Sequence, residues 1–180
     1  RDVVSGHYYV GKGEGVLQAG GSFRAGWDVS TVLGVADSRF VLSAGGSIDL
    51  GGVFSPTFLP VPQFWATDLK TFTTDFYEFS RDSGVTLLAA GGDIAIGKDG
   101  GPFISPNVGG SFGNPVFARY GSSYGDVWPA SLIAHAASGR IDFLKGSGQR
   151  GLELFPSPTG QLELIAEGNV LLNSGGPLGL

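Results

Sequence analysis

Apolar and polar residues alternate along several short stretches of the chain, and each of these stretches leads into a turn of similar sequence. The two clearest copies are residues 39–51, RFVLSAGGSIDLG, and residues 85–97, VTLLAAGGDIAIG. Weaker copies of the turn begin at Ala19, Ser138 and Glu167. Alternation with a period of two predicts strands that bury one face. Because one copy is too short to bury its own apolar face, its repetition predicts an architecture in which neighbouring copies stack.

Glycines mark the turn in every copy. They are Gly20, Gly21, Gly45, Gly46, Gly91, Gly92, Gly139 and Gly168. Successive turns are 25, 46, 47 and 29 residues apart, which we interpret as one, two, two and one coils of about 23 to 29 residues each. Glycine suits such a corner because a positive φ, or a close approach of neighbouring backbones, excludes a Cβ atom. Short strands, glycine turns and coils of this size predict a parallel β-solenoid.

The composition fits one ordered all-β domain that covers residues 1–180. The chain has 32 glycines and 10 prolines, a content that approaches the range of disordered segments. However, 42% of the residues are hydrophobic, only 15% are charged, and there are 13 phenylalanines. This is too much apolar mass for a solvated chain. Serine, asparagine and glycine between the short apolar stretches favour strands over helices.

Two segments interrupt the repeat and predict long loop excursions, at about 53–83 and 97–128. The first contains Pro56, Pro60 and Pro62, which cannot occupy the middle of a sheet. The second is rich in Gly, Pro, Ser and Asn, with one strand candidate at 116–118. Apolar residues of the first excursion follow a helical spacing, but its threonines are poor helix formers. One short helix in 64–80 and a strand there are therefore both left open.

The first excursion also holds the candidate binding residues. They are Trp65, Phe72, Phe76, Tyr77 and Phe79. These aromatic side chains either cover or plug the solenoid core, which we favour, or form an exposed patch that binds a partner or a glycan. Asp68, Asp75, Glu78 and Asp82 lie in the same stretch, and glycoside hydrolysis uses paired carboxylates. Their spacing does not place any two of them across a cleft, so we assign no catalytic residue.

Charge and missing residue types narrow the function classes. A net charge of −5 argues against nucleic acid and anionic lipid as partners. The chain has no cysteine, and its only histidines, His7 and His135, lie far apart in the sequence. We therefore predict no disulfide, no metal and no cofactor. The chain has no methionine, no signal peptide and no long apolar run, which suggests a piece of a longer polypeptide that does not itself span a membrane.

Residues 154–170, LFPSPTGQLELIAEGNV, resemble a segment of the filamentous-haemagglutinin-like large exoproteins of two-partner secretion systems. Three further parts of the chain are similar to the same family: residues 1–11, residues 76–85 with 90–96, and residues 128–132 with 138–141. The resemblance covers most of the chain and implies a right-handed parallel β-helix. It also implies secretion through a partner pore in the outer membrane, and a role in adhesion, aggregation or contact-dependent competition. The family has no catalytic residues in its β-helix.

We therefore expect a non-catalytic structural and adhesive segment of a secreted fibre, located outside the cell or on the bacterial cell surface. The expected partners are neighbouring coils of the same long polypeptide, the outer-membrane transporter during secretion, and a glycan or protein of a host or bacterial surface. The open ends of a solenoid are sheet edges, so end-to-end self-association is also expected. Two alternatives stay open: a glycan- or protein-binding module on a β-solenoid and, less favoured, a polysaccharide-degrading β-helix enzyme.

Overall fold

The computed structural model describes residues 1–26, 31–55, 79–96, 127–143 and 152–172. Within these ranges the chain forms thirteen strands and no helix. The predicted all-β fold class is therefore confirmed. Nearly all of the stretch 64–80, where helix and strand were both left open, and the strand candidate at 116–118 lie outside the described residues.

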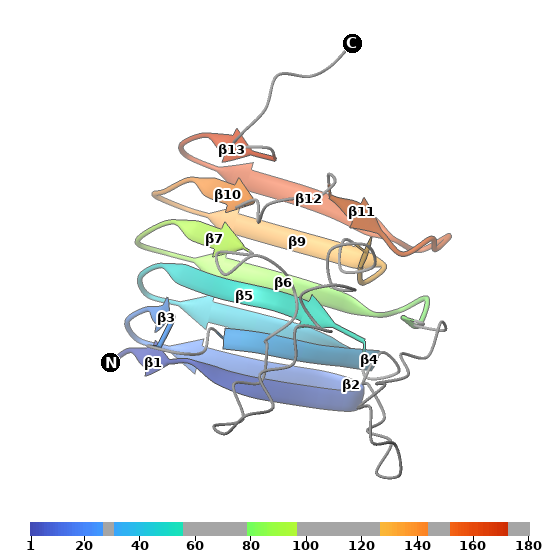
Figure 1. Cartoon of the computed structure of the whole chain (residues 1–180). Coiled ribbons are helices and arrows are strands. Elements are labelled where there is room, and N and C mark those ends of the chain that lie inside the picture. The colour runs from blue at the N-terminus through green and yellow to red at the C-terminus, as the bar shows by residue number, and fades with distance from the viewer. Residues whose placement is uncertain (27–30, 56–78, 97–126, 144–151, 173–180) are drawn as a thin grey trace, which may run out of the picture.

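Two sets of strands form opposite sides of a stack of coils (Figure 1). The long face consists of β2 (Gly6–Ala19), β4 (Thr31–Ala44), β6 (Gly84–Ala89), β9 (Ser131–Ala136) and β12 (Gln161–Ala166). The short face consists of β1 (Val3–Val4), β3 (Phe23–Arg24), β5 (Ile48–Phe54), β7 (Ile94–Ile96), β10 (Ile141–Phe143) and β13 (Val170–Leu171). The chain alternates between the faces, so each strand pairs with the next strand of its own face, one coil later. Figure 1 shows this order from the blue end to the red end.

The sheet curves so that the two faces enclose a common core. Its main path, β12-β9-β6-β4-β5-β7-β10-β13, joins eight strands that are all parallel. The path crosses from the long face to the short face at β4, whose residues 31–34 pair with β5 while residues 39–44 pair with β6. The sheet is thus nearly closed on itself. Outside it, β8 (Val127–Trp128) and β11 (Glu153–Leu154) form a separate parallel pair.

The strand register shows that each predicted step is a single coil. One column of the short face joins successive partners, one in each coil: Phe23, Ile48, Ile94, Ile141 and Val170. They are separated by the same 25, 46, 47 and 29 residues as the glycine turns. The interpretation of the two longer steps as two coils each is therefore wrong. The surplus residues fall between β5 and β6 and between β7 and β8, where the two excursions were predicted.

Alternate side chains of both faces meet in the core. On the long face Leu42 and Leu87 are partners one coil apart, and both are 0% exposed. On the short face Ile48, Ile94 and Ile141 form a buried column. Burial of one such side chain contributes about 1.5–3 kcal/mol. Because each coil covers the apolar side chains of its neighbour, the core continues along the stack.

A leucine-to-alanine substitution in one core column should lower the free energy of unfolding less in the last coil than inside the stack. Leu132 and Leu162 are partners in this column, but Leu132 is 0% exposed and Leu162 is 50% exposed. We expect Leu132→Ala to lower the free energy of unfolding by about 2–5 kcal/mol, because it leaves a cavity. Leu162→Ala should cost less than about half of that, since half of the side chain is already in water. Urea denaturation followed by circular dichroism measures both, and equal losses would contradict the prediction.

Candidate functional site

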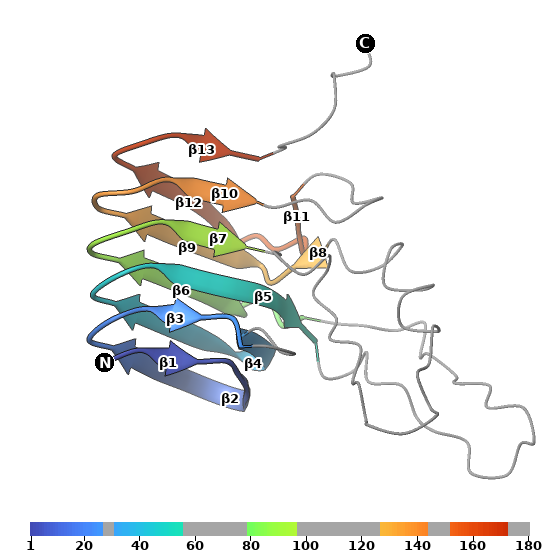
Figure 2. The same cartoon turned by 60° about the vertical axis from the view of Figure 1, so that its left-hand side comes forward.

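Five turns connect the long face to the short face, and we call them the arcs. They are residues 20–22, 45–47, 90–93, 137–140 and 167–169. Each arc follows an alanine that ends a long-face strand, and the arcs stack along one edge of the molecule (Figure 2). For a chain that acts as a structural shaft, this edge is the candidate functional site, because contacts here join every coil to the next.

Backbone hydrogen bonds continue from the strands into the arcs. The first amide of each later arc donates to the carbonyl of the strand-ending alanine one coil below. The pairs are Gly45 to Ala19 (2.9 Å), Ala90 to Ala44 (3.0 Å), Ala137 to Ala89 (2.9 Å) and Glu167 to Ala136 (3.1 Å). Backbone groups that leave a strand need partners elsewhere. Here the neighbouring coil supplies them, so the arcs themselves favour stacking.

The glycines let the arcs approach this closely. A Cβ atom on Gly91 would lie 2.5 Å from the carbonyl oxygen of Gly45, and one on Gly45 would collide in the same way with Gly20. A Cβ atom on Gly20, in the first arc, would meet nothing nearer than 3.4 Å. Positive φ among the described glycines is confined to Gly6 and Gly13, outside the arcs. Of the two physical reasons for glycine corners, the close approach is therefore the one that applies.

The second glycine of an arc faces a polar side chain of the coil below. The pairs in which an added Cβ atom would collide are Gly21 with Asp2, Gly46 with Ser22 and Gly92 with Ser47. Gly139 is closed by the carbonyl of Gly92, whereas Gly168 in the last arc is looser, 3.2 Å from the carbonyl of Gly139. All eight turn glycines predicted from the sequence thus lie in arcs. In the inner coils their lack of a side chain makes room for the neighbouring coil.

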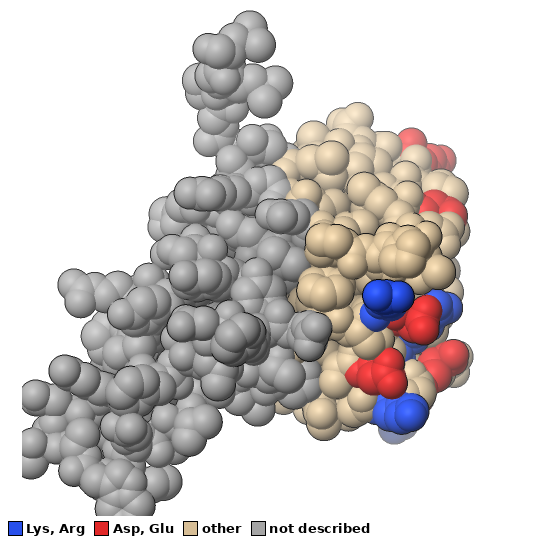
Figure 3. Space-filling view, turned by 90° about the vertical axis from the view of Figure 1, so that its right-hand side faces the viewer, with Lys and Arg blue, Asp and Glu red and all other residues tan. Residues whose placement is uncertain are grey.

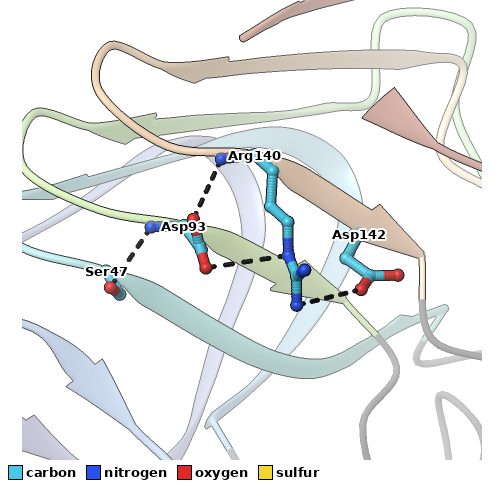
Figure 4. A network of polar contacts seen from close by, with 4 residues as sticks. All are labelled: Ser47, Asp93, Arg140 and Asp142. Atoms are coloured by element: carbon cyan, nitrogen blue, oxygen red, sulfur yellow. Dashed lines mark hydrogen bonds and ion pairs between the residues drawn. The ribbon is translucent and has the colours of Figure 1, made fainter. Parts of the chain in front are cut away.

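Asp2, which precedes β1, and the polar residues that follow the glycines in the first four arcs form a ladder along the stack. In each step the side chain accepts a hydrogen bond from the backbone amide of the equivalent residue one coil later. The steps are Ser22 N–H to Asp2 Oδ1 (2.9 Å), Ser47 N–H to Ser22 Oγ (3.0 Å), Asp93 N–H to Ser47 Oγ (3.2 Å) and Arg140 N–H to Asp93 Oδ1 (2.9 Å). Figure 4 shows the last two steps. The side chain after the glycines thus accepts the amide of the next coil in three successive arcs, at Ser22, Ser47 and Asp93.

Arg140 ends this ladder because a guanidinium group has no acceptor. Its Nε lies 3.7 Å from Asp93 Oδ2, and Nη2 lies 3.6 Å from Oδ2 of Asp142 (Figure 4). The Asp93 and Arg140 side chains are more than half exposed, whereas that of Asp142 is only 9% exposed. Exposed ion pairs contribute little. The bond from the Arg140 amide to Asp93 is therefore the stronger link between these coils.

Asp2 stands at the other end of the ladder. The Ser22 amide that donates to Asp2 holds the pKa of its carboxyl below its ordinary value, and the charge of Arg24 acts in the same direction. Arg24 Nε lies 2.7 Å from Asp2 Oδ2. The ladder thus begins with a carboxylate that accepts both a backbone and a side-chain donor.

Of the candidate aromatic residues, the structure describes Phe79 alone. The other four candidates lie outside the described residues: Trp65, Phe72, Phe76 and Tyr77. For these four, the favoured role in covering the core and the alternative role in an exposed binding patch both stay predictions. Phe79 is 3% exposed and packs edge to face against Phe155, with ring centroids 6.2 Å apart. A second edge-to-face pair, Trp128 with Phe143, has centroids 6.1 Å apart. The sequence pattern did not identify either pair, because each joins residues from different strands or connections that lie well apart in the sequence.

Among the candidate carboxylates, Asp68, Asp75 and Glu78 also lie outside the described residues. Asp82 is exposed, and its main-chain carbonyl accepts a hydrogen bond from Arg39 Nε at 3.0 Å. Within the described ranges, no cluster of three or more His, Asp or Glu side chains could hold a metal ion. These ranges also contain no helix with the length and hydropathy of a membrane span.

The two histidines do not meet in the structure. His7 lies in β2, whereas His135 lies in β9, with its Nε2 atom 2.5 Å from Glu163 Oε1 of β12. This pair adds a contact between the last two long-face strands.

Acidic and basic side chains intermix on the side of the molecule shown in Figure 3.

Comparison with protein-family models, with curated proteins and with solved structures found no match for this chain. The family resemblance seen in the sequence therefore stays a prediction.

A methyl group in the middle of the glycine column should destabilise the stack, whereas one at its end should not. We expect Gly91→Ala to lower the free energy of unfolding by about 1–3 kcal/mol, because the methyl group meets a backbone carbonyl that cannot move aside. Gly20→Ala, at the equivalent place in the first arc, should lie within about 1 kcal/mol of the parent. Denaturation midpoints of both variants test this. Equal losses of stability would show that the general difference between glycine and alanine in a turn, and not the close approach of the neighbouring coil, causes the loss.

The ladder should depend on the acceptor oxygen of Asp93 more than on its charge. Asp93→Asn keeps an oxygen for the Arg140 amide and loses the ion pair, so we expect a loss below about 0.5 kcal/mol. Asp93→Ala removes the acceptor and should cost about 1–2 kcal/mol. The same denaturation experiment measures both. If the asparagine variant lost as much stability as the alanine variant, the ion pair would be the main link.

Proposed function

We propose that this chain is a non-catalytic structural and adhesive segment of a secreted bacterial surface fibre, built as a right-handed parallel β-helix. The observation that carries the proposal is the series of arc contacts that links each coil to the next. Parallel strands joined by crossover connections are right-handed in nearly all sheets, which supports the proposed hand. A stack held by repeated backbone hydrogen bonds resists tension along its length, as a fibre requires.

The secretion route is supported by the resemblance of residues 154–170 and by the pattern of contacts. Each coil contacts mainly its neighbours, so coils can fold one after another. A chain that leaves a pore as an extended polypeptide can therefore build its fold as it emerges. The proposed partners are the neighbouring coils of a longer polypeptide, the outer-membrane transporter, and a glycan or protein on a host or bacterial surface.

A binding module on the same scaffold is the second candidate. It is favoured by the surplus residues between β5 and β6 and between β7 and β8, because the first of these segments carries the predicted aromatic residues. Segments that leave a rigid scaffold commonly carry binding functions. A polysaccharide-degrading enzyme is less favoured, since its support is limited to carboxylates that lie mostly outside the described residues.

Surface display tests the proposal. The chain is fused behind the secretion-signal domain of a two-partner exoprotein and expressed with its transporter in bacteria that lack fibres. We expect added protease to remove an epitope on the chain from intact cells, and we expect these cells to aggregate or attach to epithelial cells more than the parent strain. Omission of the transporter should abolish both effects. Retention of the folded chain inside the cell, or display without attachment, would contradict the proposal.

Deletion of the two excursions separates the candidates. Residues 56–78 and 97–126 are each replaced by a short glycine-serine linker, and circular dichroism and protease resistance check that the coils persist. Under the proposal, display and attachment continue in this variant. If attachment alone is lost while display and fold remain, the excursions form a binding module. Release of reducing ends from acidic or neutral polysaccharides by the purified chain would favour the enzyme.

A further inference from the structure

Residues 155–160 connect β11 to β12 and lie at the corner of the stack opposite the arcs (Figure 1). Ser157 Oγ donates a hydrogen bond to the main-chain carbonyl of Arg81 at 2.9 Å, and Thr159 Oγ1 donates to the same carbonyl at 3.2 Å. Arg81 precedes β6, and β9 lies between β6 and β12 in the sheet. These bonds therefore join two coils that are not neighbours, whereas each arc contact joins a coil to the next. We call residues 155–160 the clasp.

An aromatic contact spans the same two coils. Phe155, the first residue of the clasp, packs edge to face against Phe79, which precedes β6 and is buried. Aromatic pairs of this geometry stabilise a fold beyond the burial of their apolar area. The Phe155 amide also donates to the Trp128 carbonyl at 2.8 Å, in the coil of β9 between them. The clasp thus contacts both of the preceding coils.

The coil between is short at this corner. Two residues, Pro129 and Ala130, connect β8 to β9, and both are buried. Six residues connect β11 to β12. The last of them, Gly160, returns to the middle coil, where a Cβ atom would lie 2.7 Å from the Ala130 carbonyl oxygen. The longer connection thus contacts the coil of β9 at its two ends and the coil of β6 through the residues between.

The sequence of the clasp, FPSPTG, favours this conformation before any contact forms. Pro156 and Pro158 each fix one backbone φ angle. The Thr159 amide donates to Ser157 Oγ at 3.1 Å, a local turn typical of serine. Fixed angles and a local turn reduce the conformational entropy that the clasp loses when it docks. Both hydroxyl groups are thereby held toward one acceptor, the Arg81 carbonyl.

Contacts between neighbours alone would let the coils of a solenoid open one at a time. We propose that the clasp couples the coil of β12 to the coil of β6, so that β6, β9 and β12 open as one cooperative unit. The coil of β12 cannot separate from the coil of β9 without also breaking its contacts with Phe79 and Arg81. Tension or a protease then has to open three coils together. The coupling depends on contacts within the fold and not on the proposed adhesive role, so the surface-display result does not decide it.

Native-state hydrogen exchange of the full chain tests the coupling without a variant. Exchange of individual amides is followed in increasing urea, which resolves the openings that expose each strand. We expect the slowest amides of β6, β9 and β12 to reach the same opening free energy with the same dependence on urea. An opening of β12 that needs less free energy than that of β6 would overturn the proposal.

A substitution in the coil of β6 gives the sharpest test, because it should act on a strand two positions away. We expect Phe79→Leu to speed exchange at the amides of β12 by at least about fivefold, since the edge-to-face contact is lost. In a Phe155→Leu background the same substitution should change exchange at β12 by less than about twofold, because the contact is already absent. Equal effects of Phe79→Leu in both backgrounds would show that the clasp does not couple the coils.

Leu88 and Ile165 form the matched control pair. They lie in β6 and β12, but His135 of β9 lies between them in their column. The effect of Leu88→Ala on exchange at β12 should therefore be the same, within about twofold, with and without Ile165→Ala. A dependence as large as that of the phenylalanine pair would attribute the coupling to the sheet and overturn the role of the clasp.

The hydroxyl contacts have their own control in the arcs. Ser157 Oγ donates to a carbonyl two coils away at 2.9 Å, whereas Ser138 Oγ donates to the Ala90 carbonyl of the neighbouring coil at 3.0 Å. We expect Ser157→Ala to speed exchange at β12 by at least about threefold relative to β6, and Ser138→Ala to leave this ratio unchanged. Equal effects of the two serine substitutions, or no effect of Ser157→Ala, would contradict the coupling. This pair decides the question if Phe79→Leu does not fold.

Discussion

The whole structure depends on one constraint: turns must stack at the same spacing as the strands that they connect. Parallel strands lie about 4.8 Å apart, and the arcs keep this distance because glycines face the carbonyl oxygens of the coil below. Once the arcs are in contact, the alanines before them and the aliphatic residues after them are aligned from coil to coil. The buried columns of the core follow from that alignment.

The polar ladder preserves the register where the arcs differ in length. Arcs 90–93 and 137–140 are one residue longer than the others, yet the backbone amide of Asp93 still donates to Ser47 Oγ, and Ile94 still pairs with Ile48. In the first of these two arcs the extra residue, Ala90, precedes the glycines and is exposed. A slip of one residue would turn every side chain of the next strand to the opposite face. The side-chain acceptor thus fixes the point at which each short-face strand begins.

The sequence alone predicted the alternating strands next to the glycine turns and the turn glycines themselves, because these features recur in every coil. It did not predict the number of coils, since a spacing of 46 residues fits two coils or one coil with an insertion. A signal was nevertheless present, because no further copy of the turn pattern, in which a polar and then an aliphatic residue follow the glycines, occurs between Gly46 and Gly91. The ladder and the contact of Phe79 with Phe155 join residues that are distant in sequence. No local pattern encodes such contacts, so they required the fold.

The position of the insertions follows from the same constraint. Each surplus segment lies between a short-face strand and the next long-face strand, and no arc contains more than four residues. An insertion in an arc would break the glycine column and the polar ladder together, whereas an insertion at the opposite corner leaves both intact. Chain length between coils can therefore vary on one side of the stack alone. Any binding function added to this scaffold is most easily accommodated there, where it changes no contact of the arcs.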